Sequence, residues 1–301
     1  MSELGFDGRV AIITGAGGGL GRAHALLLAS RGAMVVVNDL GGSVGGAGSD
    51  RGLAQRVVDE IEEAGGVAVA DTNSVATAEG GAAIVRTAVD TFGRVDIVVN
   101  NAGILRDKSF HNLTAEQLDP VLDVHLRGAF NVTVPAWSLM RAQGYGRVIN
   151  TTSASGLLGN FGQANYAAAK MGLWGLTKVL AIEGAAHGIQ VNAIAPIALT
   201  RMTEEMFSSL APHLSPERVA SVVAYLAHES CGISGEALSC AGGRVARFFV
   251  GLTDGYFDAE LTPEAVAANL TSIMSEGDYW VPNDLESQLA ELSKRFGVEG
   301  R

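Results

Sequence analysis

The sequence predicts an α/β fold, in which a doubly wound parallel sheet forms one domain and a helical extension follows at the C-terminus. Short runs rich in β-branched residues alternate with longer, alanine-rich amphipathic runs over most of the 301 residues. The short runs are apolar at consecutive positions, which is typical of parallel strands buried on both faces. Helices between such strands cross over with a right-handed sense and cover both faces of the sheet. A hydrophobic fraction of 48% and a charged fraction of 18% fit such a sheet.

The expected elements alternate regularly along the chain. We expect strands at residues 10–14, 34–38, 67–70, 95–100, 147–152 and 189–195. We expect helices near residues 19–31, 50–64, 77–92, 114–142 and 163–187. Thr114 and Gln117 have the spacing of a capping box, which would begin the fourth helix. Pro120 and Pro135 lie inside that helix and leave its continuity open, because proline removes a helical hydrogen bond.

The alternating pattern ends near residue 243. We therefore expect one domain over residues 6–245 and a C-terminal helical extension over residues 246–301. Pro263 and Pro282 divide the extension, which predicts two or three polar helices joined by turns. Within the main domain, a glycine-rich segment at residues 41–48 predicts a flexible surface loop.

Composition and charge exclude several classes of protein. A net charge of −11 argues against nucleic acid and against an anionic membrane surface as partners. Cys231 and Cys240 are too few for a disulfide framework, which favours two reduced thiols. The histidines show no metal-ligand spacing, and the sequence contains neither a signal peptide nor an apolar run long enough for a membrane span. We therefore expect a soluble, cytoplasmic protein without a metal site.

Residues 14–21, with the sequence TGAGGGLG, come directly after the first expected strand and before the first expected helix. Gly15, Gly19 and Gly21 permit a tight turn and let a ligand approach the backbone closely. The helix that follows would present free N–H groups and its positive dipole end to a pyrophosphate. This segment therefore predicts a Rossmann-like dinucleotide site.

Asp39, at the end of the second expected strand, predicts which dinucleotide this site takes. An acidic side chain there can accept hydrogen bonds from the adenosine ribose hydroxyls, and its charge would repel a 2′-phosphate. The sequence therefore favours NAD over NADP. Two alternatives stay open, because Asp39 could merely begin a turn before Gly41 and Gly42, and Arg22 could serve a phosphate. We expect Arg22 to point elsewhere on its helix.

Ser153, Tyr166 and Lys170 form a candidate catalytic group. Ser153 follows the fifth expected strand, and strand ends at the carboxyl edge of such a sheet line the ligand crevice. Tyr166 and Lys170 are four residues apart, which places them on one face of the next helix. A phenol with a pKa near 10 is a poor base at neutral pH. A nearby ammonium group such as Lys170 and the positive nicotinamide ring would both lower that pKa.

Each of these side chains then has a chemical role. Tyr166 would take the hydroxyl proton as hydride leaves the carbon, and Ser153 would hold the same oxygen. Lys170 would stabilise the phenolate and could hold the nicotinamide ribose. A tyrosine and a lysine at this spacing also occur by chance as a surface pair, and Ser153 alone could be a structural hydroxyl. A chance occurrence of this group is argued against by what precedes it along the chain, namely the glycine loop, Asp39 and the sequence NNAG at 100–103.

Together, the segments TGAGGGLG, NNAG and YAAAK and the residue Ser153 resemble the short-chain dehydrogenase/reductase family over residues 6–245. The resemblance implies a Rossmann-like fold with NAD as cofactor. It implies Ser153, Tyr166 and Lys170 as the catalytic triad, of which Ser153 and Tyr166 also bind the substrate. It implies a dinucleotide site formed by Gly15, Gly19, Leu20, Gly21, Asp39, Asn73, Ser74, Val75, Asn101, Gly103, Tyr166, Lys170, Pro196, Ala198 and Thr200.

Longer segments, among them VVVNDLGG, NNAGILRDKSF and SASGLLGNFGQANYAAAK, resemble the (3R)-hydroxyacyl-CoA dehydrogenase branch found in peroxisomal multifunctional enzymes of type 2. That branch acts in the β-oxidation of fatty-acyl or sterol side chains, and some members oxidise 17β-hydroxysteroids. The resemblance implies a (3R)-3-hydroxyacyl-CoA as substrate, with a 17β-hydroxysteroid as a second class. It also implies a homodimer or homotetramer. This sequence carries no hydratase or sterol-carrier segment, so we expect a stand-alone dehydrogenase.

Two positions depart from the family pattern. His125 stands where many members have an asparagine that supports a proton relay with the lysine. It is either a packed helix residue or a catalytic residue whose ring or backbone carbonyl supports a water chain to Lys170. Ile197 stands where members often have glycine after Pro196, which leaves the contact with the nicotinamide amide open.

Two other functions stay open. An NADPH-dependent 3-oxoacyl carrier-protein reductase would share the fold, but Asp39 argues against NADPH. A non-catalytic dinucleotide sensor could keep the glycine loop, but it would not need both Tyr166 and Lys170. We therefore expect an NAD-dependent oxidoreductase with a small-molecule substrate, an acyl-CoA or a steroid.

Overall fold

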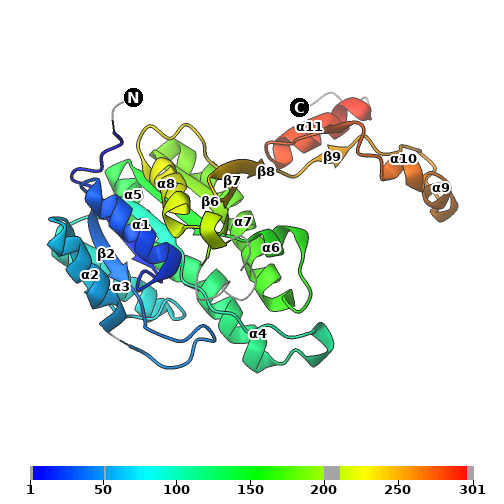
Figure 1. The fold of residues 1–301 in the computed structure, drawn as a ribbon. Coiled ribbons are helices and arrows are strands. Elements are labelled where there is room, and N and C mark those ends of the chain that lie inside the picture. The colour runs from blue at the N-terminus through cyan, green and yellow to red at the C-terminus, as the bar shows by residue number, and fades with distance from the viewer. Residues whose placement is uncertain (1–2, 51, 200–210, 297–301) are drawn as a thin grey trace. The chain divides into compact units, whose positions relative to one another are not determined.

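The computed structural model describes residues 3–50, 52–199 and 211–296. The chain divides into two compact units, Met1–Arg247 and Phe248–Arg301. The first unit contains a mostly parallel sheet with helices on both faces (Figure 1). The prediction of a doubly wound α/β fold is confirmed.

The sheet has the strand order β3-β2-β1-β4-β5-β6-β7-β8. The strand pairs from β3 through β7 are all parallel. The chain order reverses between β1 and β4, and ligands of such sheets bind at this switch point. The strands are β1 Val10–Thr14, β2 Met34–Asn38, β3 Val67–Asp71, β4 Ile97–Asn100, β5 Gly146–Thr151, β6 Ile189–Ile197, β7 Ala237–Ala241 and β8 Arg244–Phe248.

The six expected strands are β1 to β6, and the sequence pattern does not predict β7 and β8. The β7 sequence, ALSCA, mixes small and polar residues, so it has no clear apolar run. In β8, Arg244 and Arg247 interrupt the apolar residues, which is typical of a strand that is not covered on both faces. Both strands therefore lack the signal that identifies the central strands.

The helices of the first unit are α1 Gly19–Ser30, α2 Gly52–Glu63, α3 Ala78–Phe92, α4 Ala115–Leu122, α5 Gly128–Gln143, α6 Ala154–Leu158, α7 Ala164–Gly184 and α8 Pro216–Ala227. Short 3₁₀ turns lie at Phe110–Asn112, Ala185–His187 and Ala211–His213. The sequence pattern predicts all of these helices except α6 and α8.

The helix expected at 114–142 is present but contains an irregular turn. The π-helical turn Asp123–Arg127 joins α4 to α5. Pro120 and Pro135 lie inside α4 and α5 without ending either helix. Thr114 and Gln117 form the capping box that the sequence predicts.

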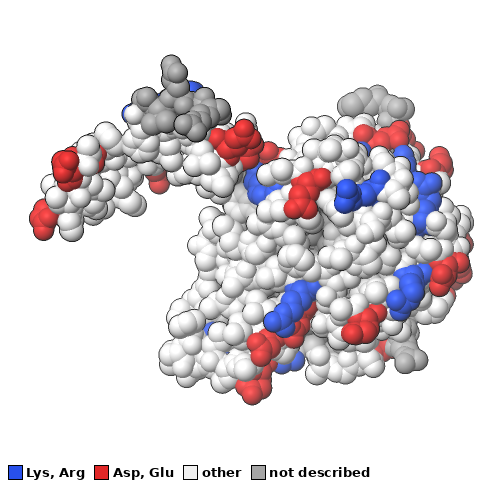
Figure 2. Space-filling model, turned by 180° about the vertical axis from the view of Figure 1, so that it is seen from behind, with Lys and Arg blue, Asp and Glu red and all other residues white. Residues whose placement is uncertain are grey.

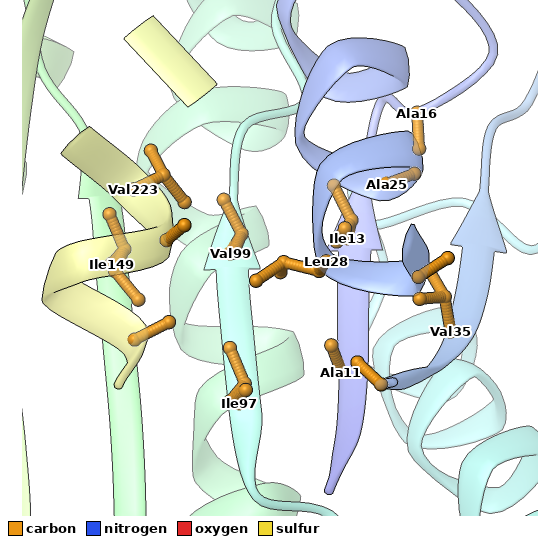
Figure 3. Close-up of a cluster of buried hydrophobic side chains, with 14 of the residues drawn as sticks. Ala11, Ile13, Ala16, Ala25, Leu28, Val35, Ile97, Val99, Ile149 and Val223 are labelled. Carbon is orange, nitrogen blue, oxygen red and sulfur yellow. The ribbon is translucent and has the colours of Figure 1, made fainter. Parts of the chain in front are cut away.

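Two apolar layers, one on each face of the sheet, explain why the strands are apolar at consecutive residues. In β1, Ala11 and Ile13 belong to one layer, whereas Val10 and Ile12 belong to the other. The first layer packs against α1, where Leu28 points toward the sheet (Figure 3). Full burial of one such isoleucine stabilises the fold by about 2 kcal/mol.

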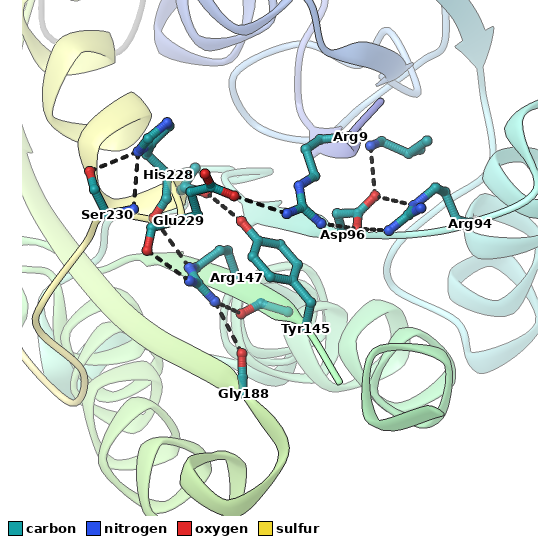
Figure 4. Close-up of polar contacts among 12 residues, drawn as sticks. Arg9, Arg94, Asp96, Tyr145, Arg147, Gly188, His228, Glu229 and Ser230 are labelled. Carbon is teal, nitrogen blue, oxygen red and sulfur yellow. Dashed lines mark hydrogen bonds and ion pairs between the residues drawn. The ribbon is translucent and has the colours of Figure 1, made fainter. Parts of the chain in front are cut away.

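A polar cluster lies at the amino ends of the parallel strands (Figure 4). The buried Asp96 carboxylate accepts hydrogen bonds from the Val10 N–H at 2.9 Å and from the Arg9 guanidinium at 3.3 Å. The guanidinium groups of Arg9 and Arg147 lie over the Tyr145 ring, 3.7 and 4.3 Å from its centre. This cluster fixes the strand ends that face away from the candidate site.

The second unit is small and partly helical. Strand β9, Leu252–Thr253, pairs antiparallel with β10, Tyr279–Trp280. Its helices are α9 Pro263–Ala268, α10 Leu270–Ile273 and α11 Leu285–Arg295. The sequence predicts two or three helices here, and it does not predict the short sheet.

The charged residues of the first unit are mixed in sign. On the face shown in Figure 2, acidic and basic side chains lie beside one another on a largely uncharged surface. A nucleic-acid partner needs a continuous basic stripe, which the described residues of that face do not form. Among the described helices, none is long and apolar enough to cross a membrane.

Candidate functional site

A cavity of about 550 Å³ lies at the carboxyl ends of the parallel strands. Its walls include residues at or just after the ends of five strands, β1, β2, β4, β5 and β6. These residues are Gly15, Asp39, Asn101, Thr152 and Pro196. The cavity therefore lies at the edge of the sheet where doubly wound folds bind their ligands.

The turn between β1 and α1 forms the wall that suits a diphosphate. Gly18, Gly19 and Leu20 line the cavity, and no side chain caps the N-terminus of α1. The N–H groups of the first helical turn therefore stay available for an anion, and the helix dipole favours one. Gly15 has a φ of +66°, and a Cβ there would lie 2.8 Å from the Ala102 Cα. Only glycine fits this position.

Gly21 shapes the turn but does not line the cavity. A Cβ on Gly21 would lie 2.2 Å from the carbonyl oxygen of Gly15 and 2.7 Å from Asn101 Nδ2. Gly21 therefore allows α1 to pack closely against the turn, and it acts on a ligand only through the shape of the loop.

Asp39 both begins a turn and faces the cavity. Its carboxylate accepts hydrogen bonds from the Gly17 N–H at 2.8 Å and from the Gly41 N–H at 2.7 Å. Asp39 thus begins a turn, and its contact with a ribose stays a prediction. Arg22 donates from Nε to Glu60 at 3.1 Å, so its guanidinium is directed to α2, away from the cavity, as expected.

Asn101 connects β4 to the phosphate turn. Its Nδ2 donates to the carbonyl oxygen of Thr14 at 2.9 Å and to that of Gly15 at 3.2 Å. Gly103, two residues further on, leaves room for an imidazole, because a Cβ there would lie 2.4 Å from His125 Cε1. The NNAG segment therefore holds the strand ends together and makes space for His125.

Ser153, Tyr166 and Lys170 come together in the cavity wall. Ser153 is the N-cap of α6, and a hydrogen bond joins its side chain to the Tyr166 phenol. Lys170 Nζ lies 5.4 Å from the centre of the Tyr166 ring. Lys170 also donates to the carbonyl oxygen of Thr151 at 2.5 Å. Helix α7 thus places Tyr166 and Lys170 side by side against the end of β5.

Burial dominates the pKa values of this group. It lowers the pKa of the Lys170 amine from 10.5 to about 7. Burial also raises the pKa of the Tyr166 phenol, against the opposing effect of the Ser153 hydrogen bond. The sequence predicts a drop in this pKa from Lys170 and a positive nicotinamide ring acting together, whereas burial of the phenol acts in the opposite direction.

His125 lies in the π-helical turn and contacts Tyr166 directly. The two rings meet edge-on, with centres 5.2 Å apart and planes at 88°. His125 Nε2 lies 3.0 Å from the Ile104 nitrogen and 2.8 Å from the Ile104 oxygen. Its Nδ1 has no hydrogen-bond partner among the described residues. Burial, and then the field of Lys170, lower the pKa of His125, so the imidazole is neutral at pH 7.

The cavity brings together most of the residues that the sequence predicts. Its lining includes Gly15, Gly19, Leu20, Asp39, Asn73, Ser74, Val75, Asn101, Gly103, His125, Ser153, Tyr166, Lys170, Pro196 and Ala198. Ile197, which departs from the family pattern, also lines it. Thr200 lies outside the described residues.

Sequence reasoning missed one segment of the cavity wall, which lies within residues 40–46. The Leu105 N–H donates to the Val44 carbonyl oxygen at 3.0 Å, and Arg106 Nε donates to the Gly45 carbonyl oxygen at 2.9 Å. Residues 41–48 form a surface loop as expected, since all of them are exposed or half-buried, and these two bonds hold one part of the loop against the cavity. Its position directly after a strand was the available signal, since such loops lie at the ligand edge of the sheet.

The fold and the site agree with a known family. The short chain dehydrogenase family matches residues 9–211 of this chain. The chain belongs to the short-chain dehydrogenase/reductase family. It is therefore an oxidoreductase, and its Rossmann-like sheet carries the nicotinamide dinucleotide site of that family.

Three relatives of this short-chain dehydrogenase/reductase are larger proteins. Peroxisomal multifunctional enzyme type 2 of Mus musculus is 51% identical over 307 residues, covering 99% of this chain and 41% of the mouse protein. Peroxisomal hydratase-dehydrogenase-epimerase of Saccharomyces cerevisiae is 54% identical over 245 residues, covering 80% of this chain and 27% of the yeast protein. The structure of full-length peroxisomal multifunctional enzyme type 2 from Drosophila melanogaster has a TM-score of 0.82 and 38% identity, covering 99% of this chain and 51% of that chain. This chain thus spans only part of the length of each of these proteins.

Proposed function

We propose that this protein is an NAD-dependent dehydrogenase that oxidises the secondary alcohol of a (3R)-3-hydroxyacyl-CoA to a ketone. One observation carries the proposal. The Ser153, Tyr166 and Lys170 group lies in the same cavity as Asp39 and the uncapped N-terminus of α1. One part of the cavity suits a diphosphate and a ribose, and another offers a proton acceptor beside a hydroxyl.

Tyr166 is the proposed general base. Its phenolate oxygen takes the proton of the substrate hydroxyl as the carbinol C–H bond breaks. Ser153 donates a hydrogen bond to the substrate oxygen. NAD, when bound, supplies the hydride acceptor and a positive charge beside the phenol. That charge opposes the effect of burial, which raises the pKa of Tyr166. In the reverse direction the phenol protonates the ketone oxygen.

Lys170 is proposed to bind the nicotinamide ribose and to pass protons. An ammonium has three donors, and the Thr151 carbonyl occupies one of them. The others can donate to ribose hydroxyls. A pKa of about 7 lets Lys170 exchange protons at neutral pH, so it can receive the proton that Tyr166 takes up. His125 is proposed to support this group, since its ring packs against Tyr166.

NAD is the proposed cofactor in preference to NADP. The Asp39 carboxylate lines the cavity and would repel a 2′-phosphate. Arg22 is engaged by Glu60, so it does not offer a compensating charge. Both contacts support the preference that the sequence predicts.

The acyl-CoA substrate rests on similarity to the multifunctional enzymes, which are 51% and 54% identical to this chain. A 17β-hydroxysteroid is a second substrate class that the family resemblance implies. We also propose a homodimer or homotetramer, because Met171, Val179 and Ile182 are exposed on α7. Leu173 is buried and belongs to the core. A cytoplasmic location is our proposal from the sequence.

A substrate panel tests the proposal. The purified protein is mixed with NAD or NADP and with (3R)- and (3S)-3-hydroxyacyl-CoAs of several chain lengths, and with a 17β-hydroxysteroid. We expect NADH formation with the (3R) isomers. Faster reduction of a 3-oxoacyl carrier protein with NADPH would instead assign a reductase. NAD binding without turnover of any substrate would assign a dinucleotide sensor.

A further inference from the structure

Residues 41–50, which we call the strap, form a compact loop between β2 and α2 (Figure 1). The ends of the strap touch, because a Cβ on Gly41 would lie 2.1 Å from the carbonyl oxygen of Asp50. Inside it, the Ser43 N–H donates to the Ala47 oxygen at 2.9 Å, and the Gly46 N–H donates to the Ser43 oxygen at 2.8 Å. Loops of this length with adjoining ends and internal bonds are compact units, and they are frequently functional.

The strap forms part of the cavity wall. Gly42, Ser43, Val44 and Gly46 line the cavity near Asp39. The proposed function places the adenosine half of the dinucleotide at Asp39. A dinucleotide in the cavity would therefore contact the strap.

Two contacts of the strap involve the segment that follows β4. The Val44 carbonyl oxygen accepts a hydrogen bond from the Leu105 N–H at 3.0 Å. Gly46 packs on Ile104, since a Cβ on Gly46 would lie 3.1 Å from Ile104 Cδ1. The strap thus crosses from the β2 side of the cavity to the β4 side.

Arg106 makes the third contact with the strap. Of the three contacts, it is the one in which a side chain donates a hydrogen bond. Its Nε donates to the Gly45 carbonyl oxygen at 2.9 Å, and its Nη1 donates to the Glu116 carbonyl oxygen at 2.5 Å. Hydrogen bonds from a charged donor are stronger than neutral ones. The Arg106 carbonyl oxygen accepts from Asn165 Nδ2 at 2.9 Å, and Asn165 Oδ1 accepts from the Tyr166 N–H at 2.8 Å. Arg106 therefore joins the strap to α4 and to the start of the catalytic helix α7.

We propose that Arg106 is a positioning residue that latches the strap over the bound dinucleotide and slows its release. This inference rests on the proposed function, since it requires a dinucleotide in the cavity. The strap opens when the Arg106–Gly45 bond and the Gly46–Ile104 contact break, and neither of these contacts includes Ser153, Tyr166 or Lys170. Loss of the latch therefore speeds NADH release and raises the KM for NAD, while the chemical step stays intact. Where NADH release limits turnover, kcat rises.

Substitutions at two positions, Arg106 and Gly46, weaken the contacts that hold the strap. Arg106→Met removes both guanidinium bonds, and Arg106→Lys keeps the charge but reaches only one carbonyl. Gly46→Ala acts independently, because Gly46 has a φ of +78° and its Cβ would press on Ile104. Two matched controls lie elsewhere. Arg86→Met removes an exposed arginine of α3, and Gly65→Ala introduces a Cβ at a φ of +83° with no atom within 4 Å.

The test measures NADH release from the full chain by stopped-flow fluorescence, together with KM and kcat for NAD. We expect Arg106→Met to raise the release rate about tenfold or more, and Arg106→Lys to raise it less. Gly46→Ala should raise it about threefold or more, at the cost of a strained backbone. The two controls should stay within about twofold of the wild type. The KM for NAD should rise with the release rate, and kcat should not fall.

An unchanged rate of NADH release in both Arg106→Met and Gly46→Ala overturns the proposal. An equal rise of that rate in Arg106→Met and Arg86→Met overturns it as well. If Arg106→Met does not fold, the comparison of Gly46→Ala with Gly65→Ala decides. Wild-type protein that binds neither NADH nor NADPH overturns the proposed function itself. If the wild type binds NADH normally and the variants release it at the wild-type rate, the role of Arg106 is overturned and the proposed function stands.

Discussion

Lys170 Nζ lies 5.4 Å from the centre of the Tyr166 ring and donates a hydrogen bond to the Thr151 carbonyl oxygen at 2.5 Å. The amine is buried, and burial lowers its pKa to about 7. Burying an amine costs stability, because the unfolded chain holds its proton more tightly than the folded one. The arrangement that suits Lys170 for proton exchange therefore weakens the fold.

Lys170→Met should be inactive but more stable than the wild type at pH 7. The folded pKa of about 7 lies below the ordinary lysine pKa of 10.5, so between these values the unfolded state binds more protons. The free energy of unfolding of the wild type therefore rises with pH across this range, by at most about 1.4 kcal/mol per pH unit. The methionine variant lacks this contribution.

Urea unfolding of both proteins at pH 7, 8 and 9 measures the effect. The stability difference between Lys170→Met and the wild type should shrink as the pH rises. Lys178→Met, on the same helix, serves as the control. A difference that stays constant from pH 7 to 9 would show that Lys170 keeps its ordinary pKa.

Because of His24 in α1, we expect the free energy of unfolding to depend on pH below neutrality. The residue is fully buried, and neither ring nitrogen has a hydrogen-bond partner among the described residues. Burial lowers its pKa from 6.5 to about 3. The unfolded state therefore binds the extra proton first, and the wild type loses stability as the pH falls from 6.5 toward 3.

His24→Leu should remove this loss, which is at most about 1.4 kcal/mol per pH unit. The measurement is the free energy of unfolding between pH 4.5 and 7 for the wild type, for His24→Leu and for a control variant of the exposed His111, His111→Leu. The control should keep the wild-type slope. Identical slopes for His24→Leu and the wild type would exclude His24 as the source.

The sequence predicts the central sheet well because each strand is buried on both faces. Ala11 and Ile13 face one apolar layer and Val10 and Ile12 face the other, so the strand has no polar position to interrupt its pattern. The turn and strand-end residues of the site follow from the same order of elements. Some of these positions need a residue that the local backbone conformation dictates, as the positive φ of Gly15 requires glycine.

Other features depend on contacts between distant segments, which local patterns do not reveal. The strap at 41–50 is composed like a flexible loop, and its contacts with Ile104, Leu105 and Arg106 hold it against the cavity. The rise in the Tyr166 pKa comes from tertiary burial, whereas spacing alone suggested a drop. The role of Gly21 in packing also appears only when α1 lies against Gly15.

Asp39→Asn should reduce the preference for NAD over NADP. The asparagine keeps an acceptor oxygen for the Gly17 or Gly41 N–H but removes the charge that repels a 2′-phosphate. We expect the ratio of kcat/KM values for NAD and NADP to fall by about tenfold or more. Asp59→Asn, at an exposed position of α2, is the matched control. An unchanged ratio would mean that another residue sets the preference.

Hydride transfer in a single turnover of Tyr166→Phe tests the central claim most directly. Phenylalanine keeps the ring contacts with His125 and Lys170 and removes only the hydroxyl. NADH formation is followed after mixing the NAD complex with a (3R)-3-hydroxyacyl-CoA, and Tyr145→Phe, in the polar cluster at the far end of the sheet, is the control. We expect Tyr166→Phe to bind the dinucleotide normally and to form NADH at least about a hundredfold more slowly, while Tyr145→Phe reacts like the wild type. Near-normal NADH formation by Tyr166→Phe would contradict the assignment of this phenol as the base.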